Sequence, residues 1–155
     1  MSENLNILLA QTNPIVGNIE HNRDLVLDIV SKNKNADLIV FTELVLSGYP
    51  PEDLVLKSAF QNKVCDAFHE IMDASVESES YIIIGRPWKK NEQLYNAAIV
   101  LHKGKVFHRH LKNTLPNYGV FDEKRIFAAG DESSFFEIKG NKIALFICEE
   151  IWDSE

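Results

Sequence analysis

Cys148 has the setting in this chain that most favours chemistry. It follows the apolar run of residues 143–147 and stands directly before Glu149 and Glu150. A strand that ends in a sharp turn exposes the residue at its end, and the backbone N–H groups that follow can stabilise an oxyanion beside it. That is how an acyl-transfer nucleophile is presented. Most free cysteines are instead small buried apolar residues, so Cys148 needs partners elsewhere in the chain to become a nucleophile.

Glu43 and Lys112 are candidates for those partners, since both also follow apolar runs. Residues 36–42 have a strand pattern that ends at Glu43, and residues 106–111 alternate as in a strand before Lys112. Each has an ordinary alternative: Glu43 can be a surface carboxylate at a strand end, and Lys112 can be a solvated lysine. Because ligands of α/β proteins bind at the carboxyl ends of strands, one sheet could bring both residues and Cys148 to a common edge.

These three residue types suffice for thiol-based acyl transfer. A thiol has a pKa well above neutrality and needs a base or a positive neighbour to become a thiolate. Glu43 could take the proton and later return it to a leaving amine, while Lys112 could hold the oxyanion together with a backbone N–H. With Lys112 beside it, Cys148 should be alkylated faster than Cys65, the other cysteine of the chain.

The elements that must position these residues follow an α/β order. Strands are predicted at residues 5–11, 36–42, 81–85, 94–101, 106–111, 134–138 and 142–147, and helices at residues 20–33 and 52–74. They imply two layers, a mixed β-sheet with two helices on one face. His108 and His110 are interpreted as one polar face of their strand, so no histidine enters the predicted chemistry.

Composition and charge argue against several classes of function. The net charge of −7, with scattered lysines and arginines, does not favour a nucleic-acid or anionic-membrane surface. Two cysteines do not make a disulfide framework. The start of the chain lacks a signal-peptide pattern, and no apolar run approaches the roughly 20 residues that span a bilayer. The expected location is the cytoplasm, with neither nucleic acid nor membrane as a partner.

The order Glu43, Lys112, Cys148, each at a strand end, resembles the nitrilase (carbon–nitrogen hydrolase) superfamily. Residues 43–54, 112–125 and 148–152 are more similar to one branch of it, the glutaminase domains of glutamine-dependent NAD synthetases. Other branches share the three residues but usually lack the Gly-Tyr-Pro-Pro-Glu-Asp-Leu continuation of the first segment and the Leu-Pro-Asn-Tyr-x-Val-Phe-Asp-Glu run of the second. The resemblance extends from the first strand to the last residue.

This resemblance implies a role for five residues. Glu43 is the general base, Lys112 the electrophilic stabiliser and Cys148 the nucleophile that forms a thioester with glutamine. Tyr118 matches a position that contacts the glutamine substrate, and Glu149 matches a contact of the glutamine α-amino group. Both have ordinary alternatives: Tyr118 can simply pack its loop, and Glu149 can be a solvated carboxylate.

The resemblance also implies parts beyond residues 1–155. Nitrilase domains are four-layer α-β-β-α sandwiches and are usually longer, so the chain is expected to be the amino-terminal portion of a glutaminase domain, inactive alone. The synthetase domain, which would use ATP and Mg, is expected to be absent, because the sequence has no Ser-Gly-Gly-type phosphate loop. The glutaminase site should need neither metal nor cofactor. Expected partners are glutamine, the synthetase domain and further copies of the chain.

Hydrolysis of the glutamine amide, supplying ammonia for ATP-dependent NAD synthesis from deamido-NAD, is therefore the expected function of the full-length enzyme. One alternative is another nitrilase-type amidase that acts on a small carboxamide. The other is a fragment that folds or binds partners without a complete catalytic site. The segments at residues 48–54 and 115–123 favour the first function over the second.

Overall fold

The computed structural model describes residues 4–131 and 134–152. Its strands and α-helices are β1 (Ile7–Ala10), α1 (Ile19–Lys32), β2 (Leu38–Phe41), α2 (Ser58–Ala74), β3 (Tyr81–Lys90), β4 (Gln93–His102), β5 (Lys105–Leu111), β6 (Ser134–Ile138) and β7 (Asn141–Leu145). Short 3₁₀ helices are η1 (Glu52–Leu56), η2 (Ser75–Glu77), η3 (Glu123–Arg125) and η4 (Cys148–Ile151). Within the described residues, neither α-helix combines the length and the apolar content that crossing a bilayer requires.

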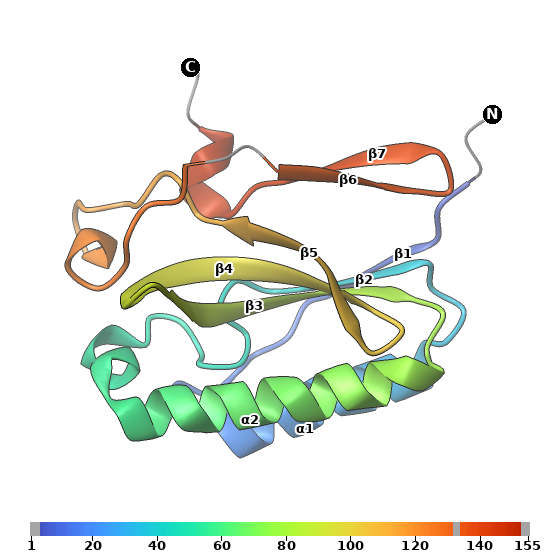
Figure 1. The fold of residues 1–155 in the computed structure, drawn as a ribbon, viewed down its shortest axis with the longest axis horizontal. Coiled ribbons are helices and arrows are strands. Elements are labelled where there is room, and N and C mark those ends of the chain that lie inside the picture. The colour runs from blue at the N-terminus through green and yellow to red at the C-terminus, as the bar shows by residue number, and fades with distance from the viewer. Residues whose placement is uncertain (1–3, 132–133, 153–155) are drawn as a thin grey trace.

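The elements are arranged in three layers (Figure 1). Within the described residues, the middle layer is a five-stranded sheet in the order β1-β2-β3-β4-β5. Strands β1, β2 and β3 are parallel, whereas β4 runs antiparallel to both β3 and β5. Helices α1 and α2 cover one face, and the β6–β7 hairpin lies over the other. The predicted mixed sheet with helices on one face is confirmed, but the hairpin adds a layer that the two-layer prediction lacked.

The central strands are apolar on both faces because both faces are covered. On β3, Ile82 and Ile84 belong to the core between sheet and helices. Ile83 instead belongs to a second core that includes Phe136 and Leu145 of the hairpin. A strand buried on two sides needs a continuous apolar run rather than alternation, which is the pattern that predicted this strand.

The helix predicted over residues 52–74 is in fact two elements. η1 ends before Lys57, whose backbone is extended with φ −79° and ψ 123°, and α2 begins at the next residue. The apolar stripe that predicted a helix lies within α2, where it packs on the sheet. The single buried residue of η1, Val55, packs instead with Leu44 and Leu115 in a separate cluster. η1 and α2 therefore pack on different parts of the molecule, and the chain changes direction between them at Lys57.

The topology brings two of the three predicted catalytic positions to one edge of the main sheet. Strands β2 and β5 run in the same direction, and Glu43 and Lys112 follow their carboxyl ends. Cys148 follows β7, which belongs to the hairpin. The prediction that one sheet carries all three is therefore wrong for Cys148. Figure 1 shows η4, which begins at Cys148, beside the end of β5.

Candidate functional site

Lys112 is completely buried, although a lone lysine after a strand is ordinarily solvated. Its backbone N–H donates to the Asn96 carbonyl oxygen (2.9 Å), and its own carbonyl oxygen accepts from the Gly130 N–H (2.8 Å). Its Nζ donates to Glu43 Oε1 at 2.8 Å and to Glu123 Oε1 at 3.0 Å. Burial opposes the charged form, but the bonds to the two carboxylates outweigh it and raise the pKa of Lys112. The solvated alternative is wrong.

Glu43 reaches Lys112 from a tight turn after β2. The next residue, Leu44, has φ +49°, in the left-handed region. Gly85 of β3 makes room for this turn, since a Cβ there would lie 2.4 Å from Leu44 N and 2.9 Å from Glu43 C. Glu43 Oε1 also accepts a hydrogen bond from Asn96 Nδ2 at 2.6 Å. The Glu43 side chain remains 19% exposed, so it borders solvent while Lys112 does not.

Glu123, in η3, is a buried member of the cluster that the sequence analysis did not identify. Its Oε1 accepts hydrogen bonds from Lys112 Nζ (3.0 Å) and from the Tyr49 hydroxyl (2.9 Å), and its Oε2 lies 3.5 Å from Asn96 Nδ2. Burial, followed by the bond to Glu123, raises the pKa of Tyr49, so this hydroxyl remains a donor. The sequence did contain a signal for this residue, because Glu123 ends the segment at residues 115–123 that carries the family resemblance. The resemblance alone assigned no role to its carboxylate.

Cys148 lies in a sharp turn and is exposed. It is the first residue of η4, and its φ of +49° places it in the left-handed region. Partial loss of hydration and the charge of Glu43 raise the pKa of the Cys148 thiol, while Lys112 acts in the opposite direction. The alternative of a buried structural cysteine is therefore wrong. Lys112 has the expected influence on the thiol, but it does not decide the direction of the shift.

Tyr118 and Glu149, the two predicted substrate contacts, lie together. The Tyr118 hydroxyl donates to Glu149 Oε2 at 2.8 Å, and this bond raises the pKa of Tyr118. The Tyr118 side chain is exposed and Glu149 is half-buried, and both residues interact electrostatically with Cys148. Tyr118 also makes an edge contact with Phe121 in its own loop. It thus packs the loop and holds a carboxylate beside the thiol.

His110 lies on the same side of β5 as His108, as the alternation of the strand predicted, and it is buried. It is 2% exposed, and its Nε2 donates to Glu150 Oε2 at 2.8 Å. His108 is partly buried and contacts Ser134 Oγ. That side of β5 faces the β6–β7 hairpin and η4, since His108 contacts Ser134 and Phe136 while His110 bonds to Glu150.

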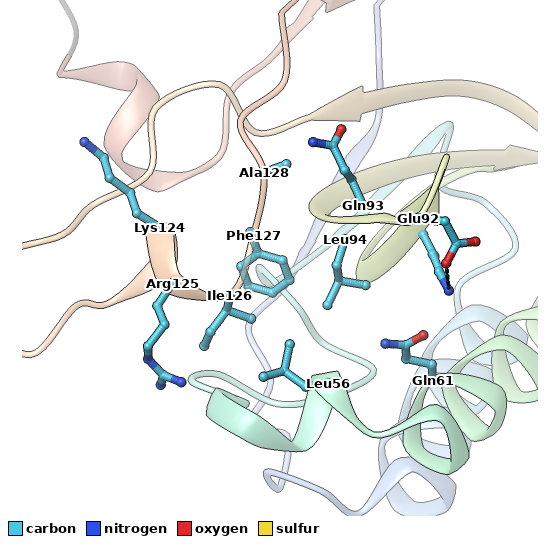
Figure 2. Close-up of a pocket in the computed structure, with 11 residues that line it drawn as sticks. Leu56, Gln61, Glu92, Gln93, Leu94, Lys124, Arg125, Ile126, Phe127 and Ala128 are labelled. Atoms are coloured by element: carbon cyan, nitrogen blue, oxygen red, sulfur yellow. Dashed lines mark ion pairs between the residues drawn. The ribbon is translucent and has the colours of Figure 1, made fainter.

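Two cavities adjoin the segment that carries Glu123. One, of about 410 Å³, is lined by Tyr49 and Glu123 together with residues 120–122 and 125–127. The other, of about 370 Å³, lies between η1 and the segment after η3, where Leu56, Leu94 and Phe127 point toward one another (Figure 2). None of the predicted site residues lines this second cavity, so it is separate from the candidate site. Among the described residues, no group of three or more His, Cys, Asp or Glu side chains is placed to hold a metal ion.

Comparisons with known proteins show which family the chain resembles. Residues 7–155 match the family described as carbon-nitrogen hydrolase. The glutamine-dependent NAD(+) synthetase of Aquifex aeolicus is 40% identical over 149 residues, which are 96% of this chain and 26% of that protein. The corresponding protein of Acinetobacter baylyi is 38% identical over 149 residues, 94% of this chain and 27% of that protein.

Solved structures give the same result for the fold. The glutamine-dependent NAD+ synthetase of Acinetobacter baumannii, in complex with ADP, has a TM-score of 0.90 at 37% identity, over 96% of this chain and 28% of that one. An amidase from Nesterenkonia sp. has a TM-score of 0.82 at 22% identity, over 96% of this chain and 57% of that one, which is a likeness of fold alone. The chain spans about a quarter of the length of the curated relatives it matches.

Proposed function

The chain belongs to the carbon–nitrogen hydrolase family, and we propose that it is part of a glutamine-hydrolysing domain in which Glu43, Lys112 and Cys148 are the catalytic residues. The strongest support is the completely buried Lys112, which forms ion pairs with Glu43 and Glu123. The charges of these three residues also shift the pKa of the exposed Cys148 thiol. Burying charges is costly, and shifted pKa values gathered around a nucleophile are typical of functional sites.

In the proposed reaction, Cys148 Sγ attacks the amide carbon of glutamine while Glu43 takes the thiol proton. A base is required because the pKa of Cys148 is raised, so the thiol does not ionise readily before attack. When the tetrahedral intermediate collapses, the C–N bond breaks and Glu43 returns the proton to the leaving nitrogen, which departs as ammonia. Water then attacks the thioester, Glu43 accepts a proton from it, and glutamate leaves as the proton returns to sulfur.

Lys112 serves the oxyanion of both tetrahedral intermediates, together with a backbone N–H after Cys148. Its ammonium group cannot move freely, since it donates to Glu43 and Glu123 and its backbone is fixed on both sides. Glu123 is a positioning residue in this scheme, because it contacts Lys112 and Tyr49 rather than the thiol. A fixed donor is effective because it requires no reorganisation when the negative charge develops.

Glutamine is the proposed substrate because the relatives that cover nearly all of this chain are named as glutamine-dependent enzymes. The pair formed by Tyr118 and Glu149 offers a carboxylate for the positive α-amino group of glutamine. In the complete protein, the ammonia would serve ATP- and Mg-dependent synthesis of NAD from deamido-NAD in another domain. No cofactor takes part in the proposed glutaminase chemistry itself. Expected partners are that domain and further copies of the chain, in the cytoplasm.

Ammonia release from glutamine by the complete protein that contains this chain tests the proposal. Cys148→Ala should reduce the release to background, while Cys65→Ala, which removes the other cysteine, should leave it unchanged. Glu43→Gln should lower kcat by about 10²- to 10⁴-fold, the usual contribution of a general base. Mass spectrometry of rapidly quenched reactions should show a glutamyl adduct on Cys148.

Two results would contradict the proposal in different ways. Hydrolysis of a small carboxamide such as butyramide, without hydrolysis of glutamine, would indicate another amidase of the same family. Full glutaminase activity in the Cys148→Ala protein would exclude Cys148 as the nucleophile. The same assay on residues 1–155 alone tests the expectation that this portion is inactive by itself.

A further inference from the structure

One buried carboxylate joins the two segments that carry Lys112 and Cys148. Glu150 is 8% exposed, and its Oε1 accepts a hydrogen bond from the backbone N–H of Asn113 at 2.7 Å. Its Oε2 accepts one from the backbone N–H of Ile147 at 2.5 Å. Asn113 directly follows Lys112, and Ile147 directly precedes Cys148. A single side chain thus bonds the immediate neighbours of both residues.

His110 completes the surroundings of this carboxylate. Its Nε2 lies 2.8 Å from Glu150 Oε2 and 3.0 Å from Oε1, and the imidazole is 2% exposed. Burial alone would raise the pKa of Glu150, but the bonds from His110, Asn113 and Ile147 outweigh it and lower the pKa. The carboxylate is therefore buried with its donors already in place, as a stable buried charge requires.

Cys148 begins the short 3₁₀ helix η4, and the bond from Ile147 N–H to Glu150 caps the start of that helix. Strand β7 ends at Leu145, three residues before Cys148. The φ of Cys148, +49°, lies in a region that non-glycine residues seldom occupy. Such a conformation persists only where the surrounding structure fixes it. The bond from Ile147 N–H to Glu150 fixes the residue before the thiol, and the bond from Asn113 N–H ties that turn to the end of β5.

We infer that Glu150 and His110 are positioning residues that hold the Cys148 turn in register with Lys112. The expected effect on kcat rests on the proposed function. The placement of the Cys148 thiol by these two residues does not. Neither residue touches the reacting atoms. A misplacement of the nucleophile by about 1 Å is enough to lower a rate by about 100-fold. A purely structural role would lower stability and leave kcat of the folded protein unchanged.

The test uses the complete protein and two pairs of variants. Glu150→Gln keeps the size of the side chain but offers one oxygen where three N–H donors converge, so kcat for glutamine should fall by about 10- to 100-fold with little change in KM. Glu137→Gln, on the exposed side of β6, is the matched control and should keep both constants. His110→Gln can still donate to Glu150, whereas His110→Phe cannot, so the Gln variant should retain the higher kcat.

A readout independent of glutamine separates this inference from the proposed function. The rate at which iodoacetamide alkylates Cys148 should change in Glu150→Gln and His110→Phe but not in Glu137→Gln. If wild type releases no ammonia yet these rates change, the proposed function fails while the positioning role stands. If folded Glu150→Gln keeps the wild-type kcat and alkylation rate, the positioning role is wrong. Should Glu150→Gln fail to fold, equal kcat and alkylation rates in His110→Gln and His110→Phe would overturn it.

Discussion

The Nζ of Lys112 lies 2.8 Å from Glu43 Oε1, inside a cluster where the lysine is completely buried. Glu123 provides a second carboxylate at 3.0 Å, so two negative groups face one ammonium. The excess negative charge acts on Cys148. Partial loss of hydration and the charge of Glu43 raise the pKa of its thiol. In the proposed reaction, this raised pKa favours attack by a thiol whose proton a base removes over attack by a preformed thiolate.

Lys112→Met should lower the free energy of unfolding by about 3 to 5 kcal/mol, because it leaves the buried carboxylate of Glu123 and the partly buried carboxylate of Glu43 without their counter-charge. Urea denaturation at neutral pH measures the change. Lys32→Met removes a lysine that pairs with Asp28 at the surface, and should alter the free energy by less than about 0.5 kcal/mol. Equal changes in the two variants would mean that the buried ion pairs contribute little to stability.

The alkylation of Cys148 should depend on pH in a way that its neighbours control. Since its pKa is raised, the rate should increase only at a higher pH than that of an ordinary thiol. Glu43→Gln removes a negative charge and should move this profile to lower pH. Lys112→Met removes the positive charge and should move it to higher pH. Iodoacetamide labelling across a pH series, followed by mass spectrometry of each cysteine, measures both shifts of the pH profile. If the profile moved in the same direction in the two variants, the prediction of opposite shifts would be wrong.

Much of the fold could be predicted because its signals are local. The apolar run at residues 81–85 and the alternation before Lys112 both mark strands that the structure contains. The strands predicted at residues 134–138 and 142–147 are present as the β6–β7 hairpin, with Lys139 and Gly140 between them. The positions of Glu43 and Lys112 at one edge follow from the parallel direction of β2 and β5. Residues 132, 133 and 153–155 lie outside the described part of the chain.

The remaining features depend on contacts between residues far apart in sequence. Lys112 is buried because Glu43, 69 residues earlier, and Glu123, 11 residues later, meet its ammonium group. His110 is buried because Glu150, 40 residues away, accepts its hydrogen bond. No local pattern distinguishes such a lysine or histidine from a solvated one. The separation of β7 from the main sheet likewise reflects packing of its apolar side on that sheet, which periodicity does not show.

Gly85→Ala should displace Glu43 and reduce both stability and activity. The added Cβ would lie 2.4 Å from Leu44 N and 2.7 Å from Thr42 O, both backbone atoms, so the turn after β2 must shift. Overpacking of this kind costs about 1 to 3 kcal/mol, which urea denaturation can measure alongside ammonia release. Gly119→Ala is the control for backbone strain without a collision, because it places a Cβ at φ +60°, where a side chain is strained, but no atom lies within 4 Å of that Cβ. An equal loss of activity in the control would mean that the collision beside Glu43 is not the cause.

Acid should remove part of the stability that Glu150 provides. Its pKa in the folded protein is lowered below the ordinary value of 4.5, because its hydrogen bonds favour the carboxylate over the opposing effect of burial. That contribution is present above the unfolded pKa and is lost as the pH falls through the folded one. The difference in unfolding free energy between wild type and Glu150→Gln should therefore shrink between about pH 6 and about pH 3. A constant difference over that range would contradict the lowered pKa, and Glu137→Gln serves as the control.

Glu149→Gln should weaken the binding of glutamine while leaving the chemical step largely intact. The Glu149 carboxylate is half-buried, directly follows Cys148 in the chain and accepts a bond from the Tyr118 hydroxyl at 2.8 Å, and in the proposed site it binds the α-amino group of glutamine. Losing a charged hydrogen bond should raise KM for glutamine by about 10- to 100-fold. Tyr118→Phe only frees the carboxylate to move, so its effect should be smaller, about 3- to 10-fold. Glutaramate, which is glutamine without the α-amino group, is the discriminating substrate in a steady-state ammonia assay. The KM for glutaramate should hardly change in Glu149→Gln. If KM rose equally for glutamine and glutaramate, the Glu149 carboxylate would not be the group that binds the amine.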